Sequence, residues 1–198
     1  PAAYKFAPSA VTTLLAATAT KVAIYVIIRF MFTVFQPDYV FNTNILTWII
    51  GPLAIFAMFA ASLISVFQTN FKRMLAYSSI AQIGYMMLGV AMFSTTGLTA
   101  SLVHMFNHGI TKAALFMGVG ALMLRIGTTF YDRISGMGRA MPLTGAAIVI
   151  GGLSLIGVPG TAGFISKWVL VQAAFEQNLW WLALIIVASS LLAVIYVW

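Results

Sequence analysis

Six apolar stretches account for most of this 198-residue chain, and each is close to or longer than the roughly 20 residues that a helix needs to cross a bilayer. Hydrophobic residues make up 62% of the chain and charged residues 7%, far from the roughly one quarter charged residues of soluble proteins. This pattern predicts an all-α integral membrane protein in a lipid bilayer, with residues 1–198 forming one transmembrane domain. The expected spans are residues 10–35, 45–67, 74–93, 98–125, 143–175 and 179–198.

The fifth stretch is too long for one simple crossing and contains a run of small and helix-breaking residues near its middle. The residues concerned are Gly157, Pro159, Gly160 and Gly163. Proline removes a backbone donor and glycine adds flexibility, so we expect the helix to be broken there. Non-helical backbone at that depth must be shielded by protein or line a cavity.

The short connecting segments differ in charge on the two predicted faces of the membrane. One face collects the basic residues Lys72, Arg73, Arg125, Arg133 and Arg139. The other carries Asp38 and Glu176. Because lysine and arginine accumulate on cytoplasmic loops, we expect both ends of the sequence to be cytoplasmic. As a separate expectation, the membrane is that of a bacterial or archaeal cell.

Several function classes are excluded by composition. The net charge of +7 does not predict nucleic-acid binding, because the basic residues lie in short loops or apolar helices instead of on one solvated face. With no cysteine and three acidic residues, the chain offers no thiolate metal site and little for acid–base catalysis. We therefore expect no cofactor, no metal site and no catalysis by this chain alone.

Three ionisable side chains, His104, His108 and Lys112, recur every four residues in an apolar segment. On an α-helix they form one row about 12 Å long, and neighbouring charges about 6 Å apart would repel by roughly 2–3 kcal/mol. We interpret the row as a proton relay. The alternatives are histidines satisfied by Asn107, Thr111 and nearby carbonyls in a packed bundle, or a two-imidazole metal site, which lacks an acidic residue to complete it.

Lys21 and Lys167 are two further lysines in apolar surroundings, where a charge costs roughly 2.5–3.5 kcal/mol and usually marks an ion or proton path. Desolvation allows a buried lysine to be neutral or charged, so each can carry a proton. Lys167 follows the predicted break by about one turn, where the dipole of the new half-helix should disfavour a cation. The alternative for both is a permanent ion pair with a carboxylate elsewhere in the protein.

The motifs around these residues resemble those of a known family, and they extend over nearly the whole chain. They are Ala7-Pro8-Ser9-Ala10 before Lys21, the segment 67–85 (FQTNFKRMLAYSSIAQIGY), the row from His104 to Lys112, and the segment 157–167 (GVPGTAGFISK). In combination they are similar to the antiporter-like membrane subunits of NADH–quinone oxidoreductase, membrane-bound hydrogenases and Mrp-type antiporters, and most similar to the D subunit of the Mrp type.

This resemblance implies a larger bundle with inverted helix repeats, of which the chain, beginning at Pro1, would be a fragment covering about the eighth to the thirteenth helices. It implies that Lys21, His104, His108, Lys112 and Lys167 relay protons, with other membrane subunits as partners and sodium or another monovalent cation as the exchanged ion. The resemblance leaves two kinds of complex possible. The chain would belong either to a cation/proton antiporter or to the pumping subunit of a quinone-reducing or hydrogenase complex. A passive scaffold with fixed pairs is the third hypothesis.

Overall fold

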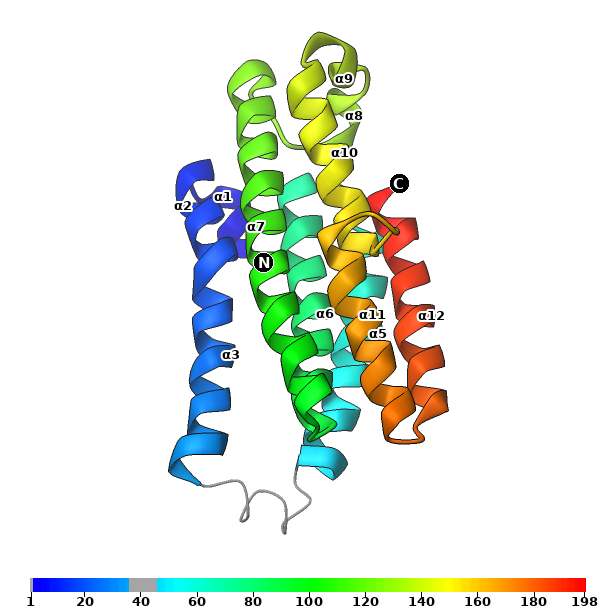
Figure 1. The fold of residues 1–198 in the computed structure, drawn as a ribbon. Coiled ribbons are helices and arrows are strands. Elements are labelled where there is room, and N and C mark those ends of the chain that lie inside the picture. Colours follow the sequence, from blue (N-terminus) through cyan, green and yellow to red (C-terminus); the bar gives the residue numbers. More distant parts are fainter. Residues whose placement is uncertain (1, 36–45) are drawn as a thin grey trace.

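The computed structural model describes residues 2–35 and 46–198, and these residues form a bundle of helices with no strand among them (Figure 1). The helical segments are α1 (Ala2–Phe6), α2 (Ser9–Leu14), η1 (Leu15–Ala19), α3 (Thr20–Arg29), η2 (Phe30–Val34), η3 (Leu46–Ile50), α5 (Gly51–Val66), α6 (Phe71–Ala91), α7 (Thr95–Ile126), α8 (Tyr131–Ile134), α9 (Met137–Ala140), α10 (Pro142–Ile156), α11 (Ala162–Glu176) and α12 (Trp180–Val197).

Five helical stretches are long and apolar enough to cross a membrane, and α10 with α11 supplies the predicted broken crossing. The five are Ser9–Val34, Trp48–Val66, Phe71–Ala91, Thr95–Ile126 and Trp180–Val197. The predicted all-α membrane fold is therefore confirmed, with helix ends within a few residues of those expected. The first crossing differs in detail, because the π-helical turn η1 interrupts its α-helix and a second π-helical turn, η2, ends it.

Local sequence explains where the central helices begin and end. The side chain of Asn70 accepts a hydrogen bond from Arg73 N, and that of Ser94 accepts one from Gly97 N, so both residues cap helix N-termini. Gly127 ends α7 in the left-handed conformation, with φ of 71° and its N–H donating to Met123 O. These caps fix α6 and α7, which carry much of the buried polar chemistry.

The break in the fifth crossing lies where glycine and proline predicted it. Gly157 closes α10 with φ of 88°, Gly160 has φ of 90° in the linking turn, and α11 begins after Thr161. At Gly163 a Cβ atom would stand 1.8 Å from Ser154 O. The first turn of α11 therefore lies directly against the last turns of α10, at a distance that only glycine permits.

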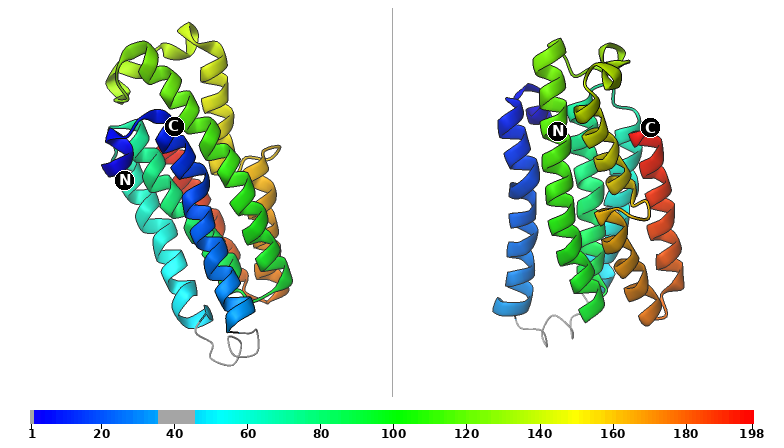
Figure 2. Two further views of the ribbon diagram at one scale, coloured as in Figure 1. Left: turned by 90° about the vertical axis from the view of Figure 1, so that its left-hand side faces the viewer. Right: turned by 45° about the horizontal axis from the view of Figure 1, so that its top comes forward.

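Helix α7 lies at the centre of the bundle, between α2 and η1 on one side and α10 and α11 on another, with α6 also against it (Figures 1 and 2). One apolar cluster joins α5, α6, α11 and α12, and a second joins α6, α7, α10 and α12. Many large apolar side chains remain exposed on α3, α5, α7 and α12. Such a surface fits lipid or neighbouring membrane helices.

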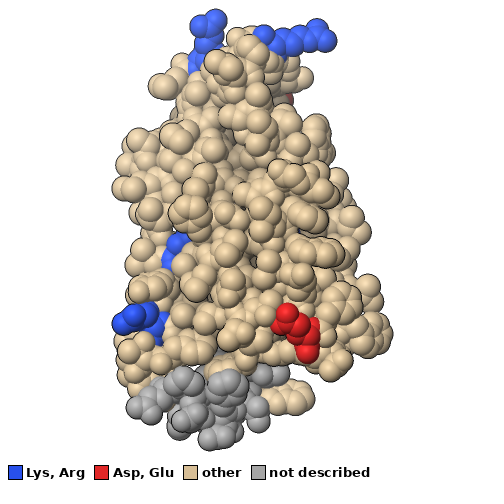
Figure 3. All heavy atoms as spheres, in the orientation of Figure 1, with Lys and Arg blue, Asp and Glu red and all other residues tan. Residues whose placement is uncertain are grey.

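Most of the charged groups visible in Figure 3 lie toward the two ends of the bundle, and one basic group is visible near mid-height. Arg125 lies in the last turn of α7, while Arg133 and Arg139 lie in α8 and α9. The start of α6 joins the same end, because Phe71 N donates to Thr129 O. Glu176 ends α11 at the opposite end, whereas Asp38 lies outside the described residues.

We expect Gly163→Ala to destabilise the protein, because the added methyl group would collide with the backbone of α10. An overpacked site of this kind costs about 1–3 kcal/mol in the free energy of unfolding. Thermal unfolding of the full-length subunit within its complex measures the change. The matched control is Gly138→Ala, where a Cβ meets nothing within 4 Å and stability should change by less than about 0.5 kcal/mol. Equal stability of the two variants would contradict the close approach.

Candidate functional site

The three residues of the predicted row, His104, His108 and Lys112, all lie on the buried face of α7. The imidazole rings of His104 and His108 are stacked, with centroids 6.0 Å apart and planes 3° from parallel. Each of the five predicted relay residues, including Lys21 and Lys167, is no more than 7% exposed. The structure thus places the five ionisable groups inside the helix bundle.

His104 is held by side chains from two other helices. Its Nδ1 lies 2.8 Å from Ser166 Oγ on α11, and its Nε2 lies 2.9 Å from Gln82 Oε1 on α6. The Tyr85 ring also lies beside it, with centroids 5.8 Å apart. Both ring nitrogens therefore have a partner, and the imidazole is oriented from both sides.

Lys167 reaches back from α11 to the end of α10. Its Nζ donates to Leu155 O and Ile156 O, at 2.9 Å in each case, and lies 4.5 Å above the Tyr85 ring. The last carbonyls of a helix lack backbone partners and form the negative end of its dipole, which attracts a cation. The expectation from the sequence considered the dipole of α11 alone, and the structure adds a second partner, because the ammonium group also lies at the carboxyl end of the preceding half-helix.

Gln82 joins His104 and Lys167 into one hydrogen-bonded group. Its Nε2 donates to Leu155 O at 3.3 Å, the same carbonyl that accepts from Lys167, while its Oε1 contacts His104. The carbonyl oxygen only accepts hydrogen bonds, so it positions the two side chains and does not itself pass a proton.

His108 differs from His104 because neither of its ring nitrogens has a hydrogen-bond partner among the described residues. Asn107 and Thr111, the side chains considered as structural partners of the histidines, bond elsewhere. Asn107 Nδ2 donates to Ala162 O at 2.8 Å, and Thr111 Oγ1 lies 3.2 Å from Ser154 Oγ. His108 is thus a buried imidazole with free donor and acceptor capacity.

Lys112 is fully buried and points toward α6. Its Nζ donates to Leu75 O at 2.6 Å and to Ser78 Oγ at 2.5 Å. Within residues 2–35 and 46–198 no hydrogen bond joins Lys112 to either histidine. The predicted row is therefore continuous along α7 in position, but its members are not hydrogen-bonded to one another: His104 bonds to α6 and α11, Lys112 bonds to α6, and His108 bonds to neither among the described residues.

Lys21 follows the π-helical turn η1, and its Nζ donates to Ala16 O within that turn. It also lines a groove of about 450 Å³ between this crossing and α7, which includes Met105 and Gly109. π-Helical turns often occur at functional sites, because they distort the regular backbone ladder. The sequence predicted the buried lysine but not the turn that supplies its acceptor.

None of the five cationic or imidazole side chains bonds a carboxylate within the described parts of the chain. The same residues contain no group of three histidine, cysteine or acidic side chains that could hold a metal. Backbone carbonyls, hydroxyls and one amide are the partners instead. The arrangement can hold, orient and exchange protons.

Sequence reasoning missed the neutral partners Gln82, Ser166 and Ser78, although all three lie in or next to the motifs that carried the family resemblance. Single polar residues in an apolar helix were the available signal. Lys72 was predicted in a loop, but it lies in the first turn of α6, fully buried, with Nζ 3.2 Å from Ala7 O. This contact holds the segment before α2 against the start of α6.

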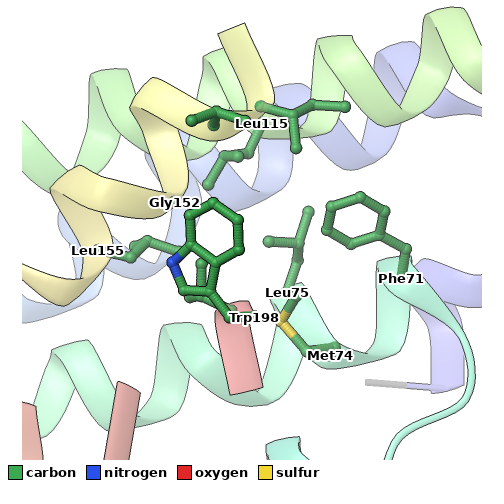
Figure 4. A pocket seen from close by; sticks show the side chains of 10 residues that line it. Phe71, Met74, Leu75, Leu115, Gly152, Leu155 and Trp198 are labelled. Carbon is green, nitrogen blue, oxygen red and sulfur yellow. The ribbon is translucent and has the colours of Figure 1, made fainter. Parts of the chain in front are cut away.

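An apolar cavity of about 70 Å³ lies beside the site, between α6, α7, α10 and the end of α12 (Figure 4). Leu75 and Leu155 line it with their side chains, together with Phe71, Leu115 and Trp198. The backbone carbonyls of Leu75 and Leu155 accept hydrogen bonds from Lys112 and Lys167 respectively. The cavity is thus lined by apolar groups that lie behind the polar site, and it does not enlarge that site.

Known proteins with similar sequences and structures were found for almost the whole chain. A family described as NADH:quinone oxidoreductase/Mrp antiporter, TM, matches residues 1–193. NADH-quinone oxidoreductase subunit N of Desulforudis audaxviator is 35% identical over 99% of the chain and 39% of that protein. The D subunit of the Na(+)/H(+) antiporter of Alkalihalophilus pseudofirmus is 33% identical over 97% of the chain and 38% of that protein.

A chain in the structure of the Mrp complex from Dietzia sp. DQ12-45-1b has a TM-score of 0.90 and 32% identity, covering 98% of this chain and 36% of its own length. The present chain thus spans about two fifths of the length of these relatives. The family match and the shared fold agree with the resemblance carried by the motifs. The chain belongs to the family of NADH:quinone oxidoreductase/Mrp antiporter transmembrane subunits.

Proposed function

We propose that this chain is part of a proton-translocating membrane subunit of a multi-subunit monovalent cation/proton antiporter. Protons would be relayed between Lys21, the row on α7 and Lys167, coupled to the movement of sodium or another monovalent cation. The observation that carries the proposal is the buried group in which Gln82 links His104 to Lys167. The similarity to the Mrp complex and to the Na(+)/H(+) antiporter relative supports the antiporter assignment.

Electrostatics favours exchangeable protons over fixed charges at this site. An ionised group at the centre of the membrane costs roughly 2.5–3.5 kcal/mol, and no carboxylate among the described residues would offset such a cost at this site. Charges about 6 Å apart also repel, so a proton on one imidazole disfavours a proton on its stacked neighbour. Such coupled groups titrate as a set, which is the behaviour that a relay requires.

The second candidate function is the equivalent pumping subunit of a quinone-reducing complex, and the relative named NADH-quinone oxidoreductase subunit N favours it. In that case redox chemistry would occur in other chains. Neighbouring genes separate the two candidates: small membrane subunits would indicate an antiporter, and flavin or iron–sulfur subunits a respiratory complex. In either complex we propose that both ends of this segment face the cytoplasm, on the side of α8 and α9.

We expect Lys167→Ala to abolish most proton translocation by the intact complex, because it removes the cation held at the end of α10. Proton uptake into vesicles containing the purified complex measures the effect, and a loss of at least about tenfold corresponds to 1.4 kcal/mol or more. Arg139→Ala removes an exposed charge from α9 and serves as the control, with uptake unchanged. Normal uptake with Lys167→Ala, in a complex that assembles normally, would support the scaffold hypothesis.

His108 allows structural and functional roles to be separated, because its ring has no hydrogen bond to lose among the described residues. We expect His108→Leu to keep or raise thermal stability, since it removes an unsatisfied buried polar group, while proton translocation falls. His104→Leu should lower both, because it leaves the buried amide oxygen of Gln82 without its hydrogen bond and removes the contact of the ring with Ser166, at a cost of about 1–3 kcal/mol. Full translocation by His108→Leu would exclude His108 from the relay.

A further inference from the structure

The orientation of the Gln82 amide determines which nitrogen of His104 carries a hydrogen. Leu155 O, 3.3 Å from Gln82 Nε2, can only accept, so the amide NH₂ group must face it. The amide oxygen then faces His104 Nε2 at 2.9 Å, and an amide oxygen also only accepts. Nε2 must therefore be the protonated nitrogen of the neutral ring, and it keeps its hydrogen when the ring is charged.

Ser166 faces the other nitrogen and has two possible partners for its single hydroxyl hydrogen. Its Oγ lies 2.8 Å from His104 Nδ1 and 3.1 Å from Gly163 O. When the ring is neutral, the hydroxyl donates to the bare Nδ1. When Nδ1 is protonated, Nδ1–H donates to Ser166 Oγ, and the hydroxyl turns to Gly163 O. Both states are fully hydrogen-bonded, and no heavy atom has to move between them.

We propose that Gln82 and Ser166 are positioning residues that hold His104 in its Nε2–H tautomer, make Nδ1 the atom that gains and loses the proton, and satisfy both protonation states through rotation of one hydroxyl. This inference deepens the proposed function and rests on it for its role in transport. The tautomer itself follows from donor and acceptor geometry alone.

The geometry also selects the side on which His104 exchanges its proton. Nδ1 faces Ser166, the residue immediately before Lys167 on α11, whereas Nε2 faces α6 and is held by an amide that cannot take a proton from it. The accepting carbonyl of Gly163 belongs to the first turn after the helix break. Protonation of His104 thus changes the hydrogen bonding of α11 at the turn that packs against α10.

The direct test is the tautomer of His104 in the unmodified complex, measured by nitrogen-15 magnetic resonance after histidine labelling. The signals of His104 are assigned by their disappearance in His104→Asn. We expect the neutral ring to carry its hydrogen on Nε2. In Gln82→Leu the acceptor for Nε2 is lost, so the hydrogen should move to Nδ1, which can then donate to Ser166. A wild-type ring with its hydrogen on Nδ1, or no change in Gln82→Leu, would overturn the inference.

Ser166→Ala tests the second half of the proposal. It should leave the hydrogen of the neutral ring on Nε2 but lower proton uptake by about tenfold, because the imidazolium loses a charge-assisted hydrogen bond. Ser166→Thr restores the hydroxyl and should recover uptake. Ser101→Ala is the matched control, since it removes a buried hydroxyl of α7 that has no partner among the described residues.

The two proposals fail in different ways. Normal uptake by His104→Asn would reject His104 as a relay residue and leave the tautomer assignment intact. Normal uptake by Ser166→Ala, together with loss of uptake in His104→Asn, would reject the positioning role of Ser166 and leave the relay intact.

Discussion

Backbone carbonyls hold the buried lysines of this protein, and the arrangement of the site depends on how those carbonyls become available. Lys167 donates to the last carbonyls of α10, which the helix break leaves without backbone N–H partners. Lys21 takes a carbonyl from a π-helical turn. Only the acceptors of Lys112, which include Ser78 Oγ and the carbonyl of Leu75, come from a regular helix. Irregular backbone thus supplies part of what carboxylates supply in soluble proteins.

The sequence predicted most of the fold, because apolar length and glycine or proline punctuation are local signals. The positions of the spans, the break near Gly157 and the burial of the five ionisable residues all follow from such signals. The partner of Lys167 could not be predicted in this way, since it depends on how α11 packs back against α10. The roles of Gln82 and Ser166 could not be predicted for the same reason, because each reaches His104 only when α6, α7 and α11 pack together.

Close packing at the break connects the fold to the site. Gly163 lets α11 approach α10, and this approach brings Lys167 within reach of the carbonyls at the end of α10. Ser154 Oγ lies at the same junction, where it accepts from Gly163 N at 3.2 Å and contacts Thr111 on α7. A change in the hydrogen bonding of the first turn of α11 therefore affects a junction where α11, α10 and α7 meet.

The length of α7 has a consequence for depth in the bilayer. Its 32 residues extend about 48 Å, whereas the hydrocarbon layer is about 30 Å thick. Arg125 in the last turn requires water, so the surplus lies beyond the membrane at that end. Counted from Thr95, His104 then lies about 14 Å into the layer and Lys112 about 26 Å. The row on α7 thus runs from the bilayer centre to the border of the hydrocarbon on the side of α8 and α9, where headgroup water begins.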